Sequence, residues 1–508
     1  MTAEAPHYLS PIQRLLVIAG LMLGISLAAL DLLIIATAVN DISTDLGDLS
    51  AAAWIFTSYL LGHTVAVMIW GKLGDLFGRG RAFTFAVLGF MAASMLAGVS
   101  QTMLMLIIAR LLQGLAAGGL VALSNAIIGD FVPARNRGTY MAVLTSVWTI
   151  AALLGPLLGG VLVDTVGWRW IFYMNLPWGA VAILLVSPVR KFSAPDRQPI
   201  IDYKGAVLLI MGLGLVSGAA FAAESGSDGW DLPLFGTITG WQLMATLLVA
   251  GLLGLAVFTW TQLHATEPVV PLSMFGNRVV RVAAIATFLF GMANFGSAIL
   301  IPLYAQLVTG VSPTEAGYSL TPVPVGILVS ATVVGWLIRR TGVYRFYPAL
   351  GGIIFAFGVF LLITMNPETP RIVAMSYAFV AGLGNGMIQP VVTIAIQNSV
   401  PYRNLGAGTA LAISTRSFGQ TIGSAIIGAV LAARISAELA GVDLGSLTPS
   451  QLEDSPDLAE TLVDPSVVAG AYHAAFDTTF WIMVAFSLLS AAAAFALPGR
   501  KLESSLKS

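Results

Sequence analysis

Apolar stretches of about 20 residues, each long enough to cross a lipid bilayer as a helix, follow one another along this chain of 508 residues. Hydrophobic residues make up 57% of the sequence and charged residues only 10%. The mean hydropathy is +0.88. These values exclude an ordinary soluble enzyme and predict an all-α integral membrane protein.

We expect fourteen membrane spans, and an even number places both termini on the same side. The predicted spans are 15–38, 52–70, 82–99, 103–127, 140–163, 170–188, 205–223, 242–262, 282–307, 316–338, 348–365, 373–397, 407–432 and 474–497. The one long connection, about 433–473, is acidic and polar. We interpret it as a solvated external segment with at most a short helix; a functional lid is the alternative.

The basic residues support this arrangement, because Lys and Arg concentrate in the cytoplasmic loops of membrane proteins. With the N-terminus inside, 19 of the 24 basic residues fall on the cytoplasmic side. Arg169, Arg371 and Arg434 fall outside, and Arg110 and Arg416 lie within spans. One missed span would place every later loop on the wrong side of the membrane and remove this concentration of basic residues. We therefore predict a multi-pass protein of the cell membrane with both termini in the cytoplasm.

Several classes of activity have no support in the sequence. The chain has no cysteine, which excludes disulfides, thiol nucleophiles and cysteine metal sites. It has no HExxH, GxSxG or Walker motif, so we expect no enzyme, no metal and no cofactor, and an ion gradient as the energy source. The first apolar run is too long for a cleavable signal peptide. The net charge of −1 says nothing about nucleic acid, because the positive and negative residues occupy different faces. We expect no nucleic-acid partner.

A short basic loop, GKLGDLFGRGR, joins the second and third predicted spans. Its glycines permit a tight turn, and its basic residues hold it on the cytoplasmic side. The loop resembles the signature GxLaDrxGrkxxl between the second and third helices of the major facilitator superfamily. Leu76 and Gly80 depart from it. The matching and flanking residues considered for function are Gly71, Lys72, Gly74, Asp75, Gly78, Arg79 and Arg81.

A weaker copy of this loop, GWLIRRTGVYR, lies at Gly335 to Arg345. An internal repeat implies two related six-helix bundles, as in transporters of this superfamily. The resemblance is to the fourteen-helix branch of drug:proton antiporters. It implies a major facilitator fold with bundles at 1–190 and 273–508, and a segment at 191–272 that carries two inserted spans, the seventh and eighth.

Two buried charges are the central candidates for function. Asp31 lies in the first span, where an ionised carboxylate must be paired, hydrated or protonated. Arg110 lies in the fourth span, within a stretch that resembles the family motif RxxQGxGaa, which also includes Gln113. By helical rise both lie roughly 10 to 12 Å below the outer surface, so they can meet. We interpret them as a proton-coupling pair; the alternative is a static ion pair that fixes two helices.

Other polar residues within spans have weaker assignments. His63 is a second titratable candidate, although a lone intramembrane histidine is more often a hydrogen-bonded packing residue. Arg416 faces the central cavity, an anionic headgroup or helix-end carbonyls. The residues expected to line the substrate cavity are Asp31, Gln113, Asn294, Asn385, Gln389 and Arg416.

Two further sets of residues are expected to control conformation. LLGPLLGG, within the fifth span, resembles the antiporter motif of the family's exporters through Gly155, Pro156, Gly159 and Gly160. Its glycines predict close helix contact and its proline a hinge. By resemblance, Asp75 would meet the start of the thirteenth span, near 404–408, and Asp130 would pair with Arg79 or Arg81. These contacts would form a cytoplasmic latch.

The resemblance implies a proton-coupled exporter of lipophilic or cationic drugs, driven by the proton gradient and working as a monomer. Two alternatives stay open: an exporter of lipids or lipophilic metabolites on the same fold, and a transporter-like sensor that moves nothing. Costly buried charges such as Asp31 and Arg110 argue against the sensor.

Overall fold

The computed structural model describes residues 9–46, 52–191, 202–224, 229–232, 236–266, 268–270, 272–307, 321–366, 369–401, 404–439 and 465–499. These residues are helical except for loops and one small hairpin. Most of the predicted external connection 433–473, and the start of the predicted span 316–338, lie outside the described residues.

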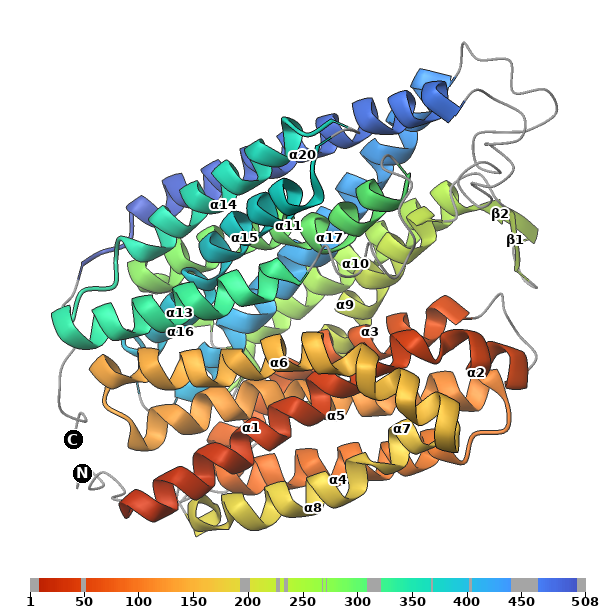
Figure 1. Cartoon of the computed structure of the whole chain (residues 1–508). Coiled ribbons are helices and arrows are strands. Elements are labelled where there is room, and N and C mark those ends of the chain that lie inside the picture. Colours follow the sequence, from red (N-terminus) through yellow and green to blue (C-terminus); the bar gives the residue numbers. More distant parts are fainter. Residues whose placement is uncertain are drawn as a thin grey trace.

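The N-terminal half is a bundle in which α5 packs against α3 and α4, and α1 packs against α6 and α8 (Figure 1). Between α1 and α2 the chain forms a short 3-10 turn, η1 (Ile35–Thr37). The helices of this half are α1 (Pro11–Ile34), α2 (Val39–Leu46), α3 (Ala52–Phe77), α4 (Arg79–Gly98), α5 (Met103–Phe131), α6 (Ala134–Val166), α7 (Trp170–Tyr173) and α8 (Asn175–Val186).

The C-terminal half forms a second bundle in which α11 packs against α17 and α20, and α15 against α13 and α14. Its helices are α11 (Arg278–Leu307), α13 (Pro322–Thr341), α14 (Tyr347–Ile363), α15 (Arg371–Gly386), α16 (Gln389–Gln397), α17 (Leu405–Leu439) and α20 (Pro465–Phe495). The two halves touch where α6 meets α13 and where α3 meets α17.

Between the bundles, α9 (Tyr203–Glu224) and α10 (Gly240–His264) pair with each other, and α9 also contacts α3 and α17. A two-stranded antiparallel hairpin, β1 (Gly229–Leu232) and β2 (Gly236–Thr239), connects them. The sequence analysis did not predict this hairpin. Strands of four residues are too short to give a recognisable alternation of polar and apolar residues.

Two predicted spans are interrupted helices rather than continuous ones. The range 170–188 divides into α7 and α8, and 373–397 divides into α15 and α16. The cause is proline, which has no N–H to bond four residues back. Pro177 therefore leaves the carbonyl of Tyr173 free where α7 ends, and Pro390 does the same for Gly386, where α15 ends.

Nine helical stretches in the described part of the chain are long and apolar enough to cross a membrane, and two shorter apolar helices accompany them. The fold is thus a multi-helix membrane architecture, and the figure of fourteen crossings stays a prediction. Most residues of α10 that face outward are apolar; Val249, Leu253 and Trp260 are 57%, 63% and 64% exposed. Lipid is the solvent that suits such a surface.

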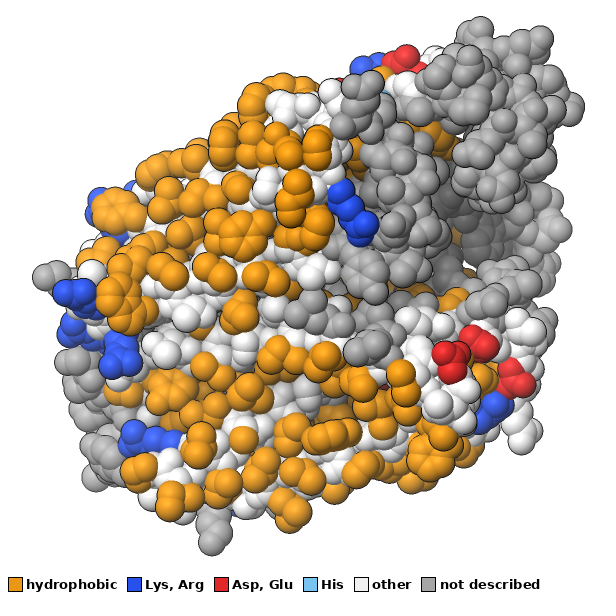
Figure 2. All heavy atoms as spheres, in the orientation of Figure 1, with side chains coloured by type: hydrophobic (Ala, Val, Ile, Leu, Met, Phe, Trp, Pro, Cys, Tyr) orange, Lys and Arg blue, Asp and Glu red, His pale blue; other side chains and the backbone are white. Residues whose placement is uncertain are grey.

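Charges collect at the two ends of the molecule, and hydrophobic side chains cover the face between them (Figure 2). Helix α1 begins and α20 ends at one end, which we call the terminal end; the other is the distal end (Figure 1). Lys and Arg side chains gather at the terminal end of the face drawn, and Asp and Glu side chains at the distal end.

Close packing of α3 on α5 depends on glycine. A Cβ atom added to Gly114 would collide with the backbone of Tyr59, whereas one added to Gly89 would meet its nearest neighbour, Ala116, at 3.6 Å. We predict that Gly114→Ala lowers the free energy of unfolding by about 1–3 kcal/mol, because overpacking forces the helices apart. Thermal unfolding in detergent measures this, with Gly89→Ala as the control. Equal melting temperatures for the two variants would contradict it.

Candidate functional site

Asp31, on α1, lies at the centre of a fully buried polar network in the N-terminal half. Its Oδ2 pairs with Nη1 of Arg110, and neither side chain is exposed. Its Oδ1 accepts hydrogen bonds from the amides of Gln113 at 2.7 Å and Asn175 at 3.0 Å. Both amides also donate to the hydroxyl of Ser94, at 2.8 and 3.2 Å. Helices α1, α5 and α8 therefore meet at one carboxyl group, and α4 joins the network through Ser94.

The Arg110 guanidinium is held in place by α3 as well as by Asp31. Its Nε donates to the carbonyl of Ile55 at 3.2 Å, and its carbon lies 4.3 Å from the centroid of the Tyr59 ring. Tyr59 is fixed in turn, because its hydroxyl donates to the carbonyl of Ala28 at 2.9 Å. Buried Nη2 of Arg110 has no hydrogen-bond partner among the described residues. The cation thus keeps its position whether or not Asp31 is charged.

All the described contacts of Asp31 are donors, which suits an ionised carboxylate. Protonation would remove the charge that balances Arg110 and place a hydrogen on an oxygen that now accepts. The link between α1 and α5 would then weaken. The charge on Asp31 therefore holds α1 against α5 and α8.

The structure brings Asp31, Arg110 and Gln113 together. His63 is separated from Arg110 by the ring of Tyr59. The His63 ring stacks on Tyr59 with centroids 6.5 Å apart and an interplanar angle of 18°. Its Nε2 is buried and has no hydrogen-bond partner in the described part of the chain. His63 therefore touches the ring that faces Arg110 and forms no hydrogen bond to Asp31.

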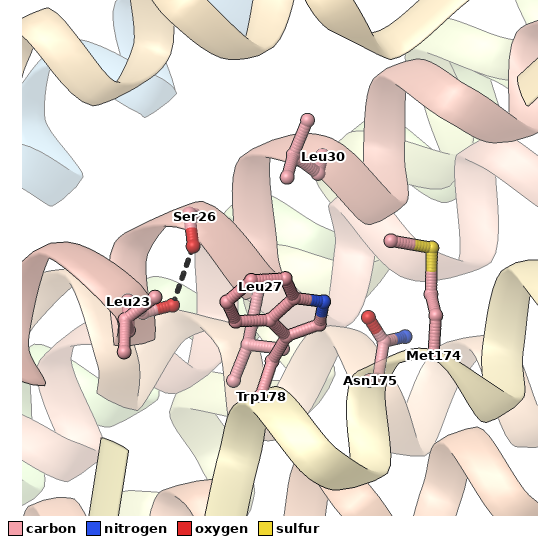
Figure 3. Close-up of a pocket in the computed structure, with 7 residues that line it drawn as sticks. All are labelled: Leu23, Ser26, Leu27, Leu30, Met174, Asn175 and Trp178. Carbon is pink, nitrogen blue, oxygen red and sulfur yellow. Dashed lines mark hydrogen bonds between the residues drawn. The ribbon is translucent and has the colours of Figure 1, made fainter. Parts of the chain in front are cut away.

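A small apolar pocket lies against this network, between α1 and α8 (Figure 3). Its volume is about 110 Å³, and its lining residues are Leu23, Ser26, Leu27, Leu30, Met174, Asn175 and Trp178. Asn175 belongs to both features, because its amide donates to Asp31. Trp178 is 49% exposed, so the pocket lies at the edge of the bundle, one side chain from the carboxyl group.

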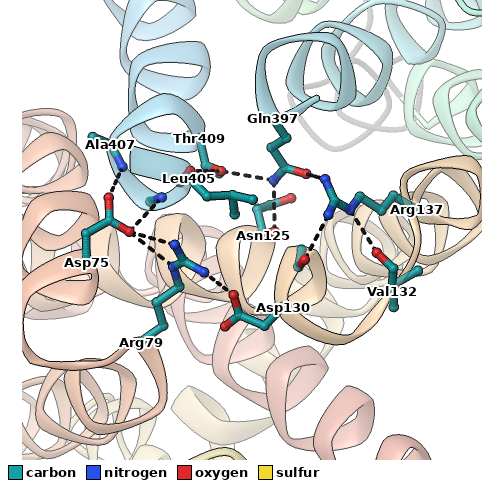
Figure 4. A network of polar contacts seen from close by, with 12 residues as sticks. Asp75, Arg79, Asn125, Asp130, Val132, Arg137, Gln397, Leu405, Ala407 and Thr409 are labelled. Carbon is teal, nitrogen blue, oxygen red and sulfur yellow. Dashed lines mark hydrogen bonds and ion pairs between the residues drawn. The ribbon is translucent and has the colours of Figure 1, made fainter. Parts of the chain in front are cut away.

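A second polar network joins the two halves at the terminal end (Figure 4). Asp75, at the end of α3, accepts from the backbone N–H groups of Gly406 and Ala407 at 2.9 and 2.8 Å. These groups belong to the first turn of α17, where the helix dipole favours an anion. Arg79 donates to Asp75 at 2.8 Å and also pairs with Asp130 on α5. One buried arginine thus links two acids and, through Asp75, the opposite half.

Not every predicted latch residue takes part. Arg81 is exposed on α4, whereas Arg79 is 7% exposed. Gly71 lies against α17, where an added Cβ would meet the carbonyl oxygen of Gly406 at 2.8 Å. Gly78 precedes α4 with a φ of 90°, a conformation that favours glycine.

Polar contacts that the sequence analysis did not identify extend this closure. Arg137 on α6 reaches Gln397 on α16, with Nη1 and Oε1 3.4 Å apart. Arg135 donates to the carbonyls of Arg339 and Arg340, both at 2.7 Å, in the last turn of α13. A cation at a helix C-terminus is favoured by the free carbonyls and the dipole. Glutamine within a helix and arginine in a loop carry no sequence signal for such a contact.

The antiporter-like motif of α6 faces α1 with two of its three glycines. A Cβ added to Gly155 would meet Cβ of Leu33 at 2.9 Å, and one added to Gly159 would meet the carbonyl oxygen of Ile34 at 2.8 Å. Gly160 does not share this contact: a Cβ added there would meet no described atom within 4 Å, because consecutive helical residues point 100° apart. Pro156 lies within α6, and its side chain is outside the described set.

The C-terminal half holds a smaller polar cluster at the junction of α11, α15 and α17. The amide of Asn385 donates to Oδ1 of Asn294 at 2.6 Å, and Nη2 of Arg416 donates to Oδ1 of Asn385 at 3.3 Å. Oε1 of Gln389 is buried without a hydrogen-bond partner among the described residues. Asn294, Asn385 and Arg416, three of the predicted cavity residues, therefore lie together.

At the distal end, Asp45 on α2 accepts from Arg169 at 2.7 Å and from the Trp168 indole at 3.2 Å. These hydrogen bonds, that from Arg169 first, hold the pKa of Asp45 below its ordinary value. Because the pKa of Asp45 is lower in the folded chain than in the unfolded chain, its hydrogen bonds stabilise the fold fully at a pH above the unfolded pKa. That stabilisation is lost as the pH falls through the folded pKa.

We predict that Asp45→Asn speeds hydrogen exchange in α2 at neutral pH, because the contact to Arg169 loses its charge. The difference from wild type should shrink in acid, where the wild-type carboxyl is protonated. Asp41→Asn, an exposed acid on the same helix, should leave exchange unchanged. Unchanged exchange in Asp45→Asn would show that this contact does not order α2.

Comparison with known proteins agrees with this architecture. The family model described as Major Facilitator Superfamily matches residues 21–424. An MFS-type transporter of Mycobacterium tuberculosis is 33% identical over 91% of this chain, which spans 66% of that relative's length. A multidrug transporter protein of Bacillus subtilis is 33% identical over 83% of this chain and 76% of its own.

Among solved structures, a proton:xylose symporter has a TM-score of 0.61 at 14% identity, with 96% of each chain covered. This likeness concerns the fold alone. The match to the family model covers most of the sequence, and the buried Asp31–Arg110 pair and the Asp75 network fall within it. The chain belongs to the Major Facilitator Superfamily, a family of membrane transporters rather than enzymes.

Proposed function

We propose that this protein is a proton-coupled exporter that exchanges lipophilic or cationic small molecules for protons by alternating access. The single observation that carries the proposal is a fully buried carboxyl group, Asp31 on α1, that is bonded to Arg110 and Gln113 on α5 and to Asn175 on α8. An acid so placed can report its protonation to helix packing. The multidrug relative in Bacillus subtilis favours export of this class of compound.

The terminal end would face the cytoplasm in this proposal, with fourteen crossings of the cell membrane and a monomer as the working unit. The Asp75 and Arg79 contacts then close the cytoplasmic side while the distal side is open. Protonation of Asp31 from outside would loosen α1, and the inward-open form would release the proton and accept cargo. No cofactor is required, because the proton gradient supplies the energy.

Everted membrane vesicles test the proposal. When their interior is made acidic, vesicles that contain the protein should accumulate a lipophilic cationic dye, and a protonophore should abolish the accumulation. Vesicles without the protein are the control. Accumulation that persists without a gradient, or none with it, would contradict proton-coupled export of this class.

A further inference from the structure

Arg416, on α17, is a half-buried arginine whose positive charge is not balanced by any described residue. Its one hydrogen bond is the 3.3 Å contact from Nη2 to Asn385. Its Nε is buried with no hydrogen-bond partner in the described part of the chain. The guanidinium carbon lies 5.9 Å from the centroid of the Phe290 ring. Among the described residues it forms no ion pair.

The surroundings of Arg416 offer hydrogen bonds but no charge. Asn385 and Asn294 are 5% and 7% exposed and bond to each other at 2.6 Å. Their amides come from α15 and α11, so three helices converge on the guanidinium. The Arg416 side chain is itself half-buried, and surface for a ligand therefore remains.

A similar arginine cluster in the N-terminal half includes a counter-ion, which the cluster around Arg416 lacks among the described residues. There Arg110 also lies over an aromatic ring, that of Tyr59, and also bonds an amide, that of Gln113 at 2.7 Å. Arg110, however, has Asp31 as its counter-ion. A cation buried without an acid is costly. The C-terminal cluster therefore has the hydrogen-bond donors of an anion site, but none of its described residues supplies a negative charge.

The depth of Arg416 in the membrane decides whether such an anion would be a phospholipid headgroup or part of a molecule that enters the protein. By helical rise Arg416 lies roughly 16 Å from the first residue of α17, near the middle of a hydrocarbon core about 30 Å thick. Phospholipid headgroups lie at the surface of that core. Since no described residue supplies an acid here, the geometry points to an acidic group on a molecule that enters the protein.

We propose that Arg416 and Asn385 bind an anionic oxygen, such as a carboxylate, phenolate or enolate, on the transported molecule. This inference rests on the proposed function and adds to its cargo lipophilic molecules that carry an acidic group. Arg416 supplies the charge, and Asn385 orients the guanidinium from α15.

The test uses a carboxylate-bearing xanthene dye and its methyl ester, which differ only in the charged group. Wild type, Arg416→Gln, Arg416→Lys and Arg434→Gln are compared by transport in everted vesicles and by dye binding to purified protein. Arg434 is an exposed arginine on the same helix and is the matched control. A lost charged hydrogen bond should weaken binding of the acid roughly 10- to 100-fold.

We expect Arg416→Gln to lose the acid but retain the ester, Arg416→Lys to recover part of the acid, and Arg434→Gln to behave as wild type. Equal loss of both dyes in Arg416→Gln would indicate a structural role and overturn the inference. So would an effect that disappears in vesicles without anionic lipid, since that would identify a headgroup as the ligand.

The proposed function and this inference can fail separately. If wild type transports the ester and neither binds nor transports the acid, the anion site is wrong and export stands. If wild type transports neither dye, export of this class is wrong. The anion site would then still be supported if purified wild type binds the acid, Arg416→Gln does not bind it and Arg434→Gln does.

Discussion

Asp31→Asn should abolish proton-driven export, with vesicle accumulation falling to the level of membranes without the protein. Asparagine keeps the shape of the side chain and can still accept from Gln113 and Asn175, but it cannot take up a proton. It also leaves Arg110 buried without a counter-ion, a change that costs about 3–5 kcal/mol of stability. Accumulation of a lipophilic dye under an imposed proton gradient is the measurement.

A double variant separates the proton role from a structural one. Asp31→Asn combined with Arg110→Gln removes both charges, so it should recover much of the lost stability. If Asp31 carries the proton, the double variant still fails to couple. If the pair only fixes α1 against α5, transport returns. Asp31→Glu, which keeps an acid, should retain part of the coupling.

Arg79→Gln should have the second-largest effect, because it breaks the buried bridge between Asp75 and Asp130. Two acids would then lie close together without their cation, which disfavours the ionised forms. We expect the terminal end to open and export to fall steeply. Arg81→Gln, two residues away and exposed, should have little effect and is the matched control.

The absence of native cysteine makes opening of this end directly measurable. Ser414→Cys introduces a single thiol at a fully buried position on α17, one helical turn beyond Ala410, which packs near Gly71. A membrane-impermeant maleimide added from the terminal side should label it slowly in the parent and several-fold faster with Arg79→Gln. Equal labelling rates in Arg79→Gln and Arg81→Gln would show that the Arg79 bridge does not close this end.

The approximate positions of the apolar helices and the buried charges were the features that the sequence could predict. Exact helix boundaries were not: α3 continues to Phe77, through most of the stretch predicted as a loop. Charged residues within apolar stretches are rare, so Asp31 and Arg110 stood out, and helical rise placed them at similar depth. The site of Asp75 was expected from the family motif, and its hydrogen bonds to Gly406 and Ala407 fall within the expected range.

The partners of these charges were harder to predict. Ser94, Asn175 and Tyr59 complete the Asp31 network, yet hydroxyl and amide side chains occur throughout membrane helices and give no signal of their own. Which face of a helix points inward decides such contacts. The same uncertainty explains Gly160 and Arg81: Gly160 points about 100° away from Gly159, and Arg81 is exposed where Arg79 is buried.

Proton release from the purified protein tests the central claim most directly. Detergent-solubilised protein in weakly buffered solution is mixed with a lipophilic cation while a pH indicator is followed. The account predicts that wild type releases protons on binding and that Asp31→Asn binds the same cation without release. Equal proton release from wild type and Asp31→Asn, or binding to wild type without any release, would contradict it.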